Sequence, residues 1–360
     1  MEKGRVGMKK FVWGIICLLT GAGIVFGCEN EKLIAAHEKA VHLFDDWMRD
    51  PYIVITPDGD YYLTCTQFAN QAEGEGFPMW KSKDLVHWEH QGIPYTLKDA
   101  SNYEEYWERF NSRKKERPGW SHEGLKLWAP EIHFIGGRWV LMHTSNVGIG
   151  NFAMTQGEQF EGPFTDWGTS FGRQHDPSIF VDDDGSVWLV SKITEIQRIK
   201  PDLSGLMGEP IRLEPSDRRM GHEGSYILKI EGKYVIFGTA WSTDTMRHGT
   251  YNLYYTTSDK LTGPYDERKF VGRFLGHGTP FQDKAGRWWC TAFYNANKPT
   301  IDGAEAAKMD LSDTAYTINK QGLTLVPLEV RLDGDDLIIR AKDPHYRYPG
   351  AEEVQQFDLD

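Results

Sequence analysis

The hydrophobic pattern of this chain repeats five times. In each unit a short apolar run leads into a turn and returns as an aromatic-rich run, behind a short head motif. The head motifs are Asp50-Pro51-Tyr52-Ile53, Ala129-Pro130-Glu131-Ile132, Asp176-Pro177-Ser178-Ile179, Glu223-Gly224-Ser225-Tyr226 and His277-Gly278-Thr279-Pro280. The turns contain Gly59, Gly137, Gly185, Gly232 and Gly286. Apolar runs joined by glycine turns predict pairs of antiparallel strands.

The spacing of the units predicts the fold. From the second unit on, the turn glycines follow one another at intervals of about 50 residues, the period of propeller blades with four strands each. The first interval is longer, because residues 96–124 form a polar insertion without strand alternation. Helical periodicity is nearly absent, which argues against an α/β fold. The pattern therefore predicts an all-β, five-bladed β-propeller.

The pattern divides the chain into four parts. We expect a signal segment over residues 1–28, a tether over 29–45, the propeller over 46–345 and a C-terminal tail over 346–360. Near the end of the propeller, residues 322–343 contain a strand pair around a turn at Asp333-Gly334-Asp335-Asp336. This pair either completes the last blade or extends across it, and the sequence does not decide between the two.

The N-terminus has the pattern of a targeting segment. Lys9 and Lys10 precede an apolar run that is short for a membrane span and suits a signal peptide. The run ends in Val25-Phe26-Gly27-Cys28, which resembles a bacterial lipobox with Cys28 as the lipidated residue. An ordinary signal peptide and a short membrane anchor are the alternatives. We expect an exported lipoprotein, periplasmic or on the outer membrane or cell surface, held to the membrane only by its lipid.

Charge and cysteine content narrow the classes of partner. The net charge of −12 argues against nucleic-acid and anionic-membrane partners.

If Cys17 is removed with the signal and Cys28 carries lipid, Cys65 and Cys290 remain, both on expected strands. A disulfide between them is conceivable after export, but two unpaired buried thiols are favoured, because cysteine is commonly a small core residue. The sequence has no CxxC pair that would indicate a zinc site.

The repeat also predicts a site. The innermost strand of each blade lines the channel, and residues two apart share a face. The first ring of side chains is expected to be Asp50, Ala129, Asp176, Glu223 and His277. The ring below it is expected to be Tyr52, Glu131, Ser178, Ser225 and Thr279. Three clustered carboxyl groups raise one another's pKa. Glycosidic hydrolysis needs such a set, with one carboxylate to activate water and one acid to protonate the leaving oxygen.

These motifs resemble those of a known family. The blade motifs of glycoside hydrolase family 43 are similar to Arg49-Asp50-Pro51, Trp128-Ala129-Pro130-Glu131-Ile132-His133, His175-Asp176-Pro177-Ser178-Ile179-Phe180, Glu223-Gly224-Ser225 and Gly276-His277-Gly278. The family comprises five-bladed propeller enzymes that act on glycans containing arabinose, xylose or galactose. The resemblance covers residues 46 to about 320, and its specificity comes from five ordered motifs at blade spacing.

The resemblance implies a role for each acid. Asp50 matches the general base that activates water, and Glu223 matches the general acid. Asp176 matches the third acid, which tunes the pKa of the proton donor and orients it. His277 matches a histidine that contacts a bound cation or its water shell in the channel. The family inverts the anomeric centre, so the carboxyl groups of Asp50 and Glu223 should stand roughly 6.5–9.5 Å apart.

Three further residues are candidates for sugar binding. Trp128 and Trp241 lie near or beside the channel motifs, and aromatic rings commonly stack on the C–H faces of sugars. Glu131 is expected either to bind an ion or a sugar hydroxyl, or to form a structural bond with neighbouring backbone. Many family members have Asp at the position of Glu131 and Pro at that of Ser225, and these departures bear on substrate choice rather than on the three acids.

The sequence therefore predicts an inverting glycoside hydrolase of the α-L-arabinofuranosidase or β-xylosidase type, acting on an oligo- or polysaccharide. No cofactor is required, and Ca²⁺ or another ion in the channel is a further expectation. Two alternatives stay open: a glycan-binding propeller lipoprotein without activity, and a glycan-active propeller enzyme of another reaction type. The sugar, the linkage, exo or endo action and the oligomeric state are not determined.

Overall fold

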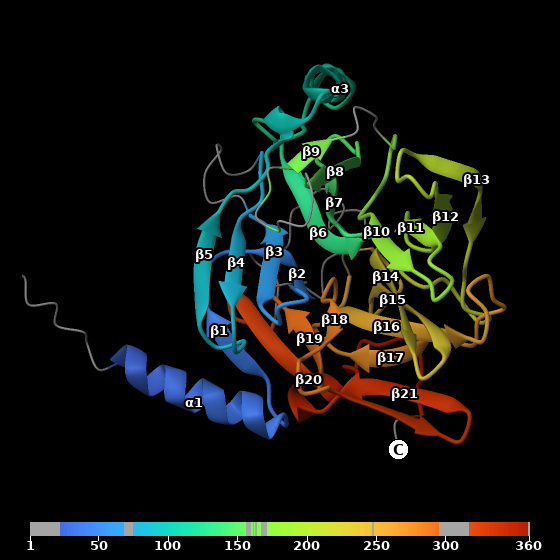
Figure 1. Cartoon of the computed structure of the whole chain (residues 1–360). Helices are drawn as coiled ribbons and strands as arrows, with labels where there is room; N and C mark the ends of the chain where they lie inside the picture. Colours follow the sequence, from blue (N-terminus) through green and yellow to red (C-terminus); the bar gives the residue numbers. More distant parts are fainter. Residues whose placement is uncertain are drawn as a thin grey trace, which may run out of the picture.

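Five antiparallel sheets stand around a common axis, with the first strand of each nearest the centre (Figure 1). The computed structural model describes residues 22–67, 75–155, 160, 162, 164–166, 171–246, 248–294 and 317–358. The five expected turn glycines all adopt a positive φ, between 77° and 81°, a conformation that glycine reaches without steric cost. The predicted five-bladed β-propeller is confirmed.

Blades one to four follow one plan, in which four consecutive strands form a sheet from the axis outward. Blade one contains β2 (Arg49–Ile55), β3 (Tyr61–Thr66), β4 (Met79–Ser82) and β5 (Trp88–Gly92). Blade two contains β6 (Leu127–Ile135), β7 (Arg138–Ser145), β8 (Asn151–Thr155) and β9 (Phe164–Asp166). Blade three contains β10 (Ser178–Val181), β11 (Val187–Ser191), β12 (Glu195–Ile199) and β13 (Leu206–Arg212). Blade four contains β14 (Glu223–Ile230), β15 (Lys233–Trp241), β16 (Tyr251–Ser258) and β17 (Lys269–Gly272).

Blade five joins the two ends of the propeller. Its strands are β18 (Pro280–Gln282), β19 (Trp288–Ala292), β20 (Leu323–Asp333) and the N-terminal β1 (Val41–Phe44), which pairs with β20 as the outermost strand. The propeller thus begins before residue 46, and the last part of the expected tether belongs to a blade. The physical reason is the burial of Val41, which is fully covered and opposite Leu325. Four residues are too few for their alternation to be recognised in the sequence.

The C-terminal strand pair has both of the roles left open by the sequence. Its first strand, β20, completes blade five, while its second, β21 (Asp336–Ala341), pairs with the far part of β20 and lies against β17 of blade four. Beyond it, the short helix α5 (Pro344–Arg347) leads into the C-terminal residues. The pair therefore connects two neighbouring blades.

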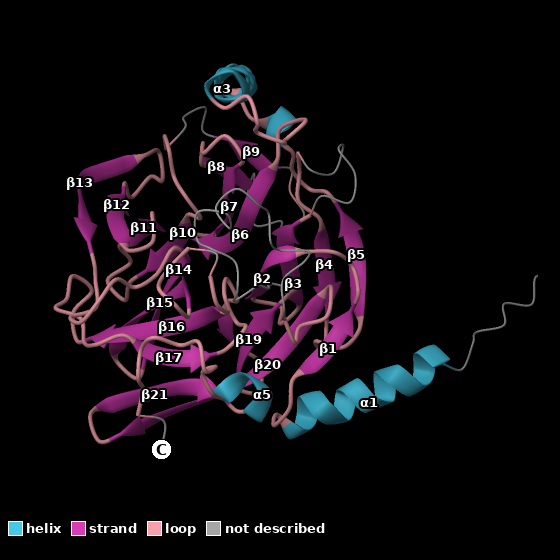
Figure 2. Cartoon of the chain, turned by 180° about the vertical axis from the view of Figure 1, so that it is seen from behind, coloured by secondary structure: helices cyan, strands magenta, loops and turns pink. Residues whose placement is uncertain are grey.

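The helices lie outside the ring of sheets (Figure 2). The insertion folds into a short 3-10 helix, η1 (Leu97–Asp99), and α3 (Tyr103–Glu116), which buries Tyr106 and Phe110 in the core beside blades one and two. The N-terminal α1 (Ala22–Ala36) contacts β1. None of the helices in the described part of the chain is long and apolar enough to cross a membrane. Residues 1–21 of the expected signal segment lie outside the described residues.

Cys65 and Cys290 are free and buried. Each packs in a hydrophobic cluster, Cys65 between blades one and five and Cys290 between blades four and five. The expectation of two unpaired core thiols is confirmed, and burial raises the pKa of both.

Candidate active site

The head positions of the blades share an unusual backbone conformation. The φ angles of Asp50, Ala129, Asp176 and His277 are positive, from 43° to 56°, and in blade four the corresponding residue is Gly224 at 64°. The left-handed region costs a non-glycine residue roughly 1–2 kcal/mol. Four such residues at equivalent places concentrate backbone strain around one end of the channel, and such strain clusters at functional sites.

Glu223 precedes the head position of its blade by one residue. The register of β14 and β15 shifts between Glu223 and Tyr226, as that of β2 and β3 shifts between Arg49 and Tyr52. Glu223 therefore corresponds to Arg49, and the ring expected from the sequence is wrong by one residue in blade four. The hairpin between the first two strands of blade four is one residue shorter than that of blade one. Counting back from the turn glycine Gly232 by the spacing that separates Asp50 from Gly59 therefore ends at Glu223, although the head residue is Gly224.

Threonines on the second strands of two blades form hydrogen bonds with residues at the head positions, across the boundaries between blades. Thr66 donates its hydroxyl to Asp50 Oδ2 at 2.8 Å and accepts the backbone N–H of Ala129 at 2.7 Å. In the same way, Thr239 accepts the backbone N–H of His277 at 2.8 Å. These bonds fix the heads to each other across the blade boundaries, so the site is a property of the closed ring.

The three predicted acids converge on one imidazole nitrogen. His277 Nδ1 lies 2.9 Å from Asp50 Oδ1, 3.9 Å from Asp176 Oδ2 and 4.0 Å from Glu223 Oε1. The side chains of Asp50, Asp176 and His277 are largely covered, whereas that of Glu223 is 28% exposed. Side chains from blades one, three, four and five thus meet in one cluster.

The two distances to His277 limit the separation of Asp50 and Glu223. The oxygens nearest to Nδ1 lie at most about 7 Å apart, the low end of the roughly 6.5–9.5 Å that inverting hydrolysis uses. This upper limit overlaps the lower part of the expected range.

Two residues that the sequence did not single out complete the cluster. His175 Nδ1 lies 3.1 Å from Asp176 Oδ2 and its Nε2 lies 3.8 Å from Glu223 Oε2. Tyr251 donates a hydrogen bond from its hydroxyl to Glu223 Oε1. His175 directly precedes the head Asp176 and was visible in that motif. Tyr251 opens β16 opposite Trp241, and only the pairing of the strands brings it to Glu223.

The histidines reverse the pKa shift expected for clustered acids. Burial would raise the pKa of Asp50, but the imidazolium of His277 lowers it below its usual value. Burial likewise opposes ionisation of Asp176, but His175 and His277 lower its pKa to about 2. Clustering therefore does not keep Asp50 or Asp176 protonated, as the sequence alone suggested, because each has a cationic neighbour.

The carboxylates in turn keep both histidines protonated. Burial would lower the pKa of His277, but Asp50 and Asp176 raise it to about 10. Asp176 likewise raises the pKa of His175 to about 9, against the effect of burial. At neutral pH both imidazoles are therefore charged, and the ring is a network of alternating charges.

Glu131 belongs to the layer below. Its Oε2 accepts the hydroxyl of Ser178 at 2.6 Å and lies 2.9 Å from His133 Nε2. The ring of His133 in turn contacts Tyr52, and Tyr52 packs near Tyr226 from blade four. These contacts engage Glu131 with side chains rather than with the backbone, and its proposed binding of an ion or sugar stays a prediction.

The two candidate tryptophans flank the cluster in different ways. The ring of Trp241 packs on that of Tyr251, with ring centroids 4.2 Å apart. Tyr251, which donates to Glu223, therefore connects Trp241 to the acid. Trp128 lies 5.6 Å from the ring of His122 in the insertion. Its buried Nε1–H has no hydrogen-bond acceptor among the described residues. Both rings are partly exposed near the heads, which is compatible with sugar stacking.

One group in the described part of the chain has the spacing of a metal site. His175, Asp176 and Glu223 each offer an atom within 4.8 Å of the others. The group has one nitrogen and two carboxylates, donors that an ion could use together with water, and the expected Ca²⁺ or other ion in the channel stays a prediction. His277 is not part of this group, and its contact with a cation or its water shell stays a prediction.

Comparisons with known proteins agree with this geometry. A family model described as glycosyl hydrolases family 43 matches residues 46–315. The chain is 24% identical over 319 residues to the β-D-galactofuranosidase xynD of Aspergillus niger, covering 81% of this chain and 85% of that protein. It is 25% identical over 259 residues to xylosidase/arabinosidase 43B of Humicola insolens, covering 66% of this chain but only 44% of that protein.

A solved structure supports the fold. The crystal structure of an endo-1,4-β-xylanase from Bacteroides thetaiotaomicron superposes with a TM-score of 0.57 and 20% sequence identity. The alignment covers 86% of this chain and 99% of that one.

Proposed function

Since this chain belongs to glycosyl hydrolase family 43 and is therefore a glycoside hydrolase, we propose that it cleaves arabinose-, xylose- or galactose-containing glycans with inversion. The names of two relatives, a galactofuranosidase and a xylosidase/arabinosidase, support this range of pentose and furanose substrates. The observation that carries the proposal is the convergence of Asp50, Asp176 and Glu223 on His277.

Asp50 is the proposed general base. Thr66 donates to one of its oxygens and His277 contacts the other, and its lowered pKa keeps it ionised at neutral pH. It takes a proton from a water molecule as the water oxygen attacks the anomeric carbon. The attack comes from the side opposite the leaving group, so the new C–O bond has the inverted configuration.

Glu223 is the proposed general acid. In its protonated form it gives a proton to the glycosidic oxygen as the bond to the anomeric carbon breaks. Its greater exposure suits a group that meets the leaving sugar, and Tyr251 holds it in place. Asp176 is proposed to orient the donor, because His175 contacts both carboxyl groups. The proton taken up by Asp50 and the one lost by Glu223 are then exchanged with solvent.

The two acid roles are tested by Asp50→Asn and Glu223→Gln. On a native oligosaccharide substrate, each variant is expected to lose roughly 10²–10⁴-fold in kcat, because each removes one proton-transfer step. Asp45→Asn, at an exposed carboxylate outside the ring, is the control and should retain wild-type kcat. Wild-type turnover in both ring variants would contradict the proposal.

The substrate is identified by a panel of aryl glycosides and native polysaccharides. Proton NMR of the first product is expected to show the anomer opposite to that of the substrate. Retention of configuration would exclude the assignment of Asp50 as a base, and release only in the presence of inorganic phosphate would indicate a phosphorylase.

No step of this reaction passes through a metal ion. Dialysis against EDTA is therefore expected to leave kcat unchanged, with activity before and after dialysis as the measurement. A loss that Ca²⁺ restores would indicate an ion in the channel and would support the cation contact expected for His277.

The N-terminal pattern supports a proposed lipid anchor at Cys28. In a bacterial host, wild-type protein should incorporate labelled fatty acid and fractionate with membranes. Cys28→Ser is expected to abolish the labelling, whereas Cys17→Ser should retain it. Labelling of the Cys28→Ser variant would contradict the lipobox assignment.

A further inference from the structure

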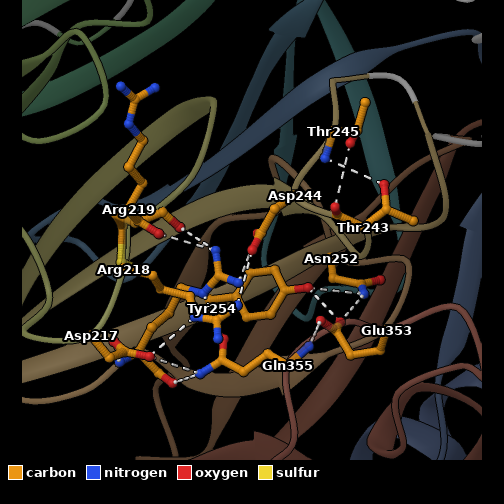
Figure 3. Close-up of polar contacts among 12 residues, drawn as sticks. Asp217, Arg218, Arg219, Thr243, Asp244, Thr245, Asn252, Tyr254, Glu353 and Gln355 are labelled. Carbon is orange, nitrogen blue, oxygen red and sulfur yellow. Dashed lines mark hydrogen bonds and ion pairs between the residues drawn. The ribbon is translucent and has the colours of Figure 1, made fainter. Parts of the chain in front are cut away.

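We propose that a C-terminal strap, residues 350–357, positions Glu223 by holding the loops of blade four through the buried Arg268. The inference rests on the proposed role of Glu223 as the proton donor. Figure 3 shows the polar contacts at this place, where residues of the loop before β14, the loop between β15 and β16, strand β16 and the strap meet. None of the strap residues touches the ring of acids directly.

Arg268 lies just before β17 with 1% of its side chain exposed. Its Nε donates to Gln355 Oε1 at 2.9 Å, and its Nη2 donates to Asp244 Oδ1 at 3.0 Å. Its guanidinium carbon lies 4.3 Å from the centroid of the Tyr254 ring. Burying this charge has a desolvation cost that well-packed apolar residues would not have. Stability alone therefore gives little reason for an arginine here.

Arg268 holds the loop that leads into Glu223. Its Nη1 donates to the backbone carbonyls of Arg219 and Met220, at 3.1 and 3.4 Å. The following residue, Gly221, packs so closely on β15 that a Cβ there would lie 2.1 Å from the carbonyl oxygen of Thr239. The next N–H, that of His222, donates to the same carbonyl at 2.6 Å. The chain from Arg219 to Glu223 thus has little freedom to move.

Arg268 and the strap also hold the second loop at the site, between β15 and β16. Asp244 in this loop accepts from Arg268, and the carbonyl of Ser242 accepts the N–H of Val354 in the strap at 2.9 Å. Glu352 accepts the hydroxyl of Thr250 at 2.7 Å. This loop carries Trp241 at one end and Tyr251 at the other, so the strap fixes the tyrosine that donates to Glu223.

The strap itself is anchored at several points. Glu353 accepts the hydroxyl of Tyr254 at 2.6 Å, and Phe357 packs on Phe270 with ring centroids 5.2 Å apart. The Gln355 amide also donates to the carbonyl of Arg268 at 2.7 Å. Gln355 is therefore the link between the strap and the arginine.

A displaced acid has a chemical signature. A glycoside with a strongly acidic leaving group departs without protonation, whereas an alkyl or sugar leaving group needs the proton. Misplacing Glu223 therefore slows only the second class. A merely structural role of the strap would lower the amount of folded enzyme, and so would lower both rates equally.

The experiment compares full-length Gln355→Leu with wild type on two substrates of the sugar identified in the panel, the 2,4-dinitrophenyl glycoside and the methyl glycoside. For the methyl glycoside, kcat/KM is expected to fall at least about tenfold, a part of the factor attributable to a general acid. For the dinitrophenyl glycoside it should fall less than about twofold. Gln197→Leu, which removes a half-buried glutamine that bonds a backbone carbonyl in blade three, should change neither.

Arg268→Met provides a second variant with the same expected selectivity, and thermal unfolding reports the folded fraction of each protein. Equal losses on both substrates, or no loss on either, in folded Gln355→Leu would overturn the inference. Glu223→Gln is the reference. Leaving-group selectivity in Glu223→Gln but not in Gln355→Leu would refute only the strap, whereas its absence from Glu223→Gln would refute the proposed donor and the inference together.

Discussion

At the scale of single residues, the site depends on charge balance. Asp50 and Asp176 ionise in nearly buried positions because His277 and His175 stay protonated beside them. These ion pairs therefore make the free energy of folding depend on pH, because a group whose pKa differs between the folded and unfolded states links stability to pH. Tyr251 completes the set, because burial and the carboxylate of Glu223 raise its pKa and keep its hydroxyl a donor.

This charge balance predicts a loss of stability at alkaline pH. The pKa of His277 rises from 6.5 to about 10 on folding, so its stabilisation is complete below pH 6.5 and is lost as the pH approaches 10. The Tm of wild type should therefore fall more between pH 7 and pH 10 than that of His277→Gln, as measured by thermal unfolding across that range.

His345→Gln, at an exposed histidine outside the ring, is the matched control and should keep the wild-type pH profile. A constant Tm difference between wild type and His277→Gln at all these pH values would show that His277 is not charged in the folded protein.

At the scale of elements, the head residue at or near the start of each inner strand has a positive φ. In blade four a glycine occupies this position, which lets the preceding residue, Glu223, supply the carboxylate. A Cβ on Gly224 would lie 2.7 Å from Cδ2 of His277. Because Gly224 has no side chain, the imidazole of His277 can lie close to its backbone. The N–H of Gly224 also donates a hydrogen bond to Asp176.

Gly224→Ala is therefore expected to impair both stability and turnover. The positive φ costs roughly 1–2 kcal/mol for alanine, and the methyl group displaces His277 from Asp50. Gly185→Ala is the matched control, because Gly185 has a φ of 78° with no atom near its would-be Cβ. Chemical denaturation should show a larger loss of stability for Gly224→Ala than for Gly185→Ala, because only the first adds a clash with His277 to the cost of the positive φ, while steady-state kinetics should show a loss of kcat only for Gly224→Ala. Equal kcat values would contradict the contact with His277.

At the scale of the whole molecule, the ring closes by pairing the two ends of the propeller. The N-terminal β1 is the outer strand of blade five, beside β20 from the C-terminal part. The hydroxyl of Thr291 in that blade donates to the carbonyl of Pro51 at 2.8 Å, next to Asp50. Closure of the ring is thus coupled to the place where the acids meet.

A charge placed in β1 is expected to open this closure. Val41→Asp puts a carboxylate at a fully buried position, which should lower the free energy of unfolding by more than about 3 kcal/mol. Val181→Asp, at a 44% exposed valine of blade three, should change it by less than about 0.5 kcal/mol. Urea denaturation measures both, and similar values for the two variants would contradict a stabilising role for β1.

Much of the site was predictable because the repeat places its heads at regular intervals. Asp50, Asp176 and His277 lie where the period put them. Glu223 was included in the ring but one residue out of register. The inner hairpin of blade four is one residue shorter than that of blade one, so the same count back from the turn glycine ends one residue before the head, Gly224. Tyr251 was not predictable, since it reaches Glu223 only through the pairing of β15 and β16.

The amino-acid sequence by itself determined the number of blades, the turn glycines and the acids at or next to the blade heads, because these follow from local patterns that repeat along the chain. Only the tertiary structure decided the charge state of the acids, the closure by β1 and the contacts of the C-terminal residues with blade four. Those features depend on which side chains meet after the ring has closed. Electrostatic energy and burial depend on distances in space, and neither is encoded in the spacing of residues along the chain.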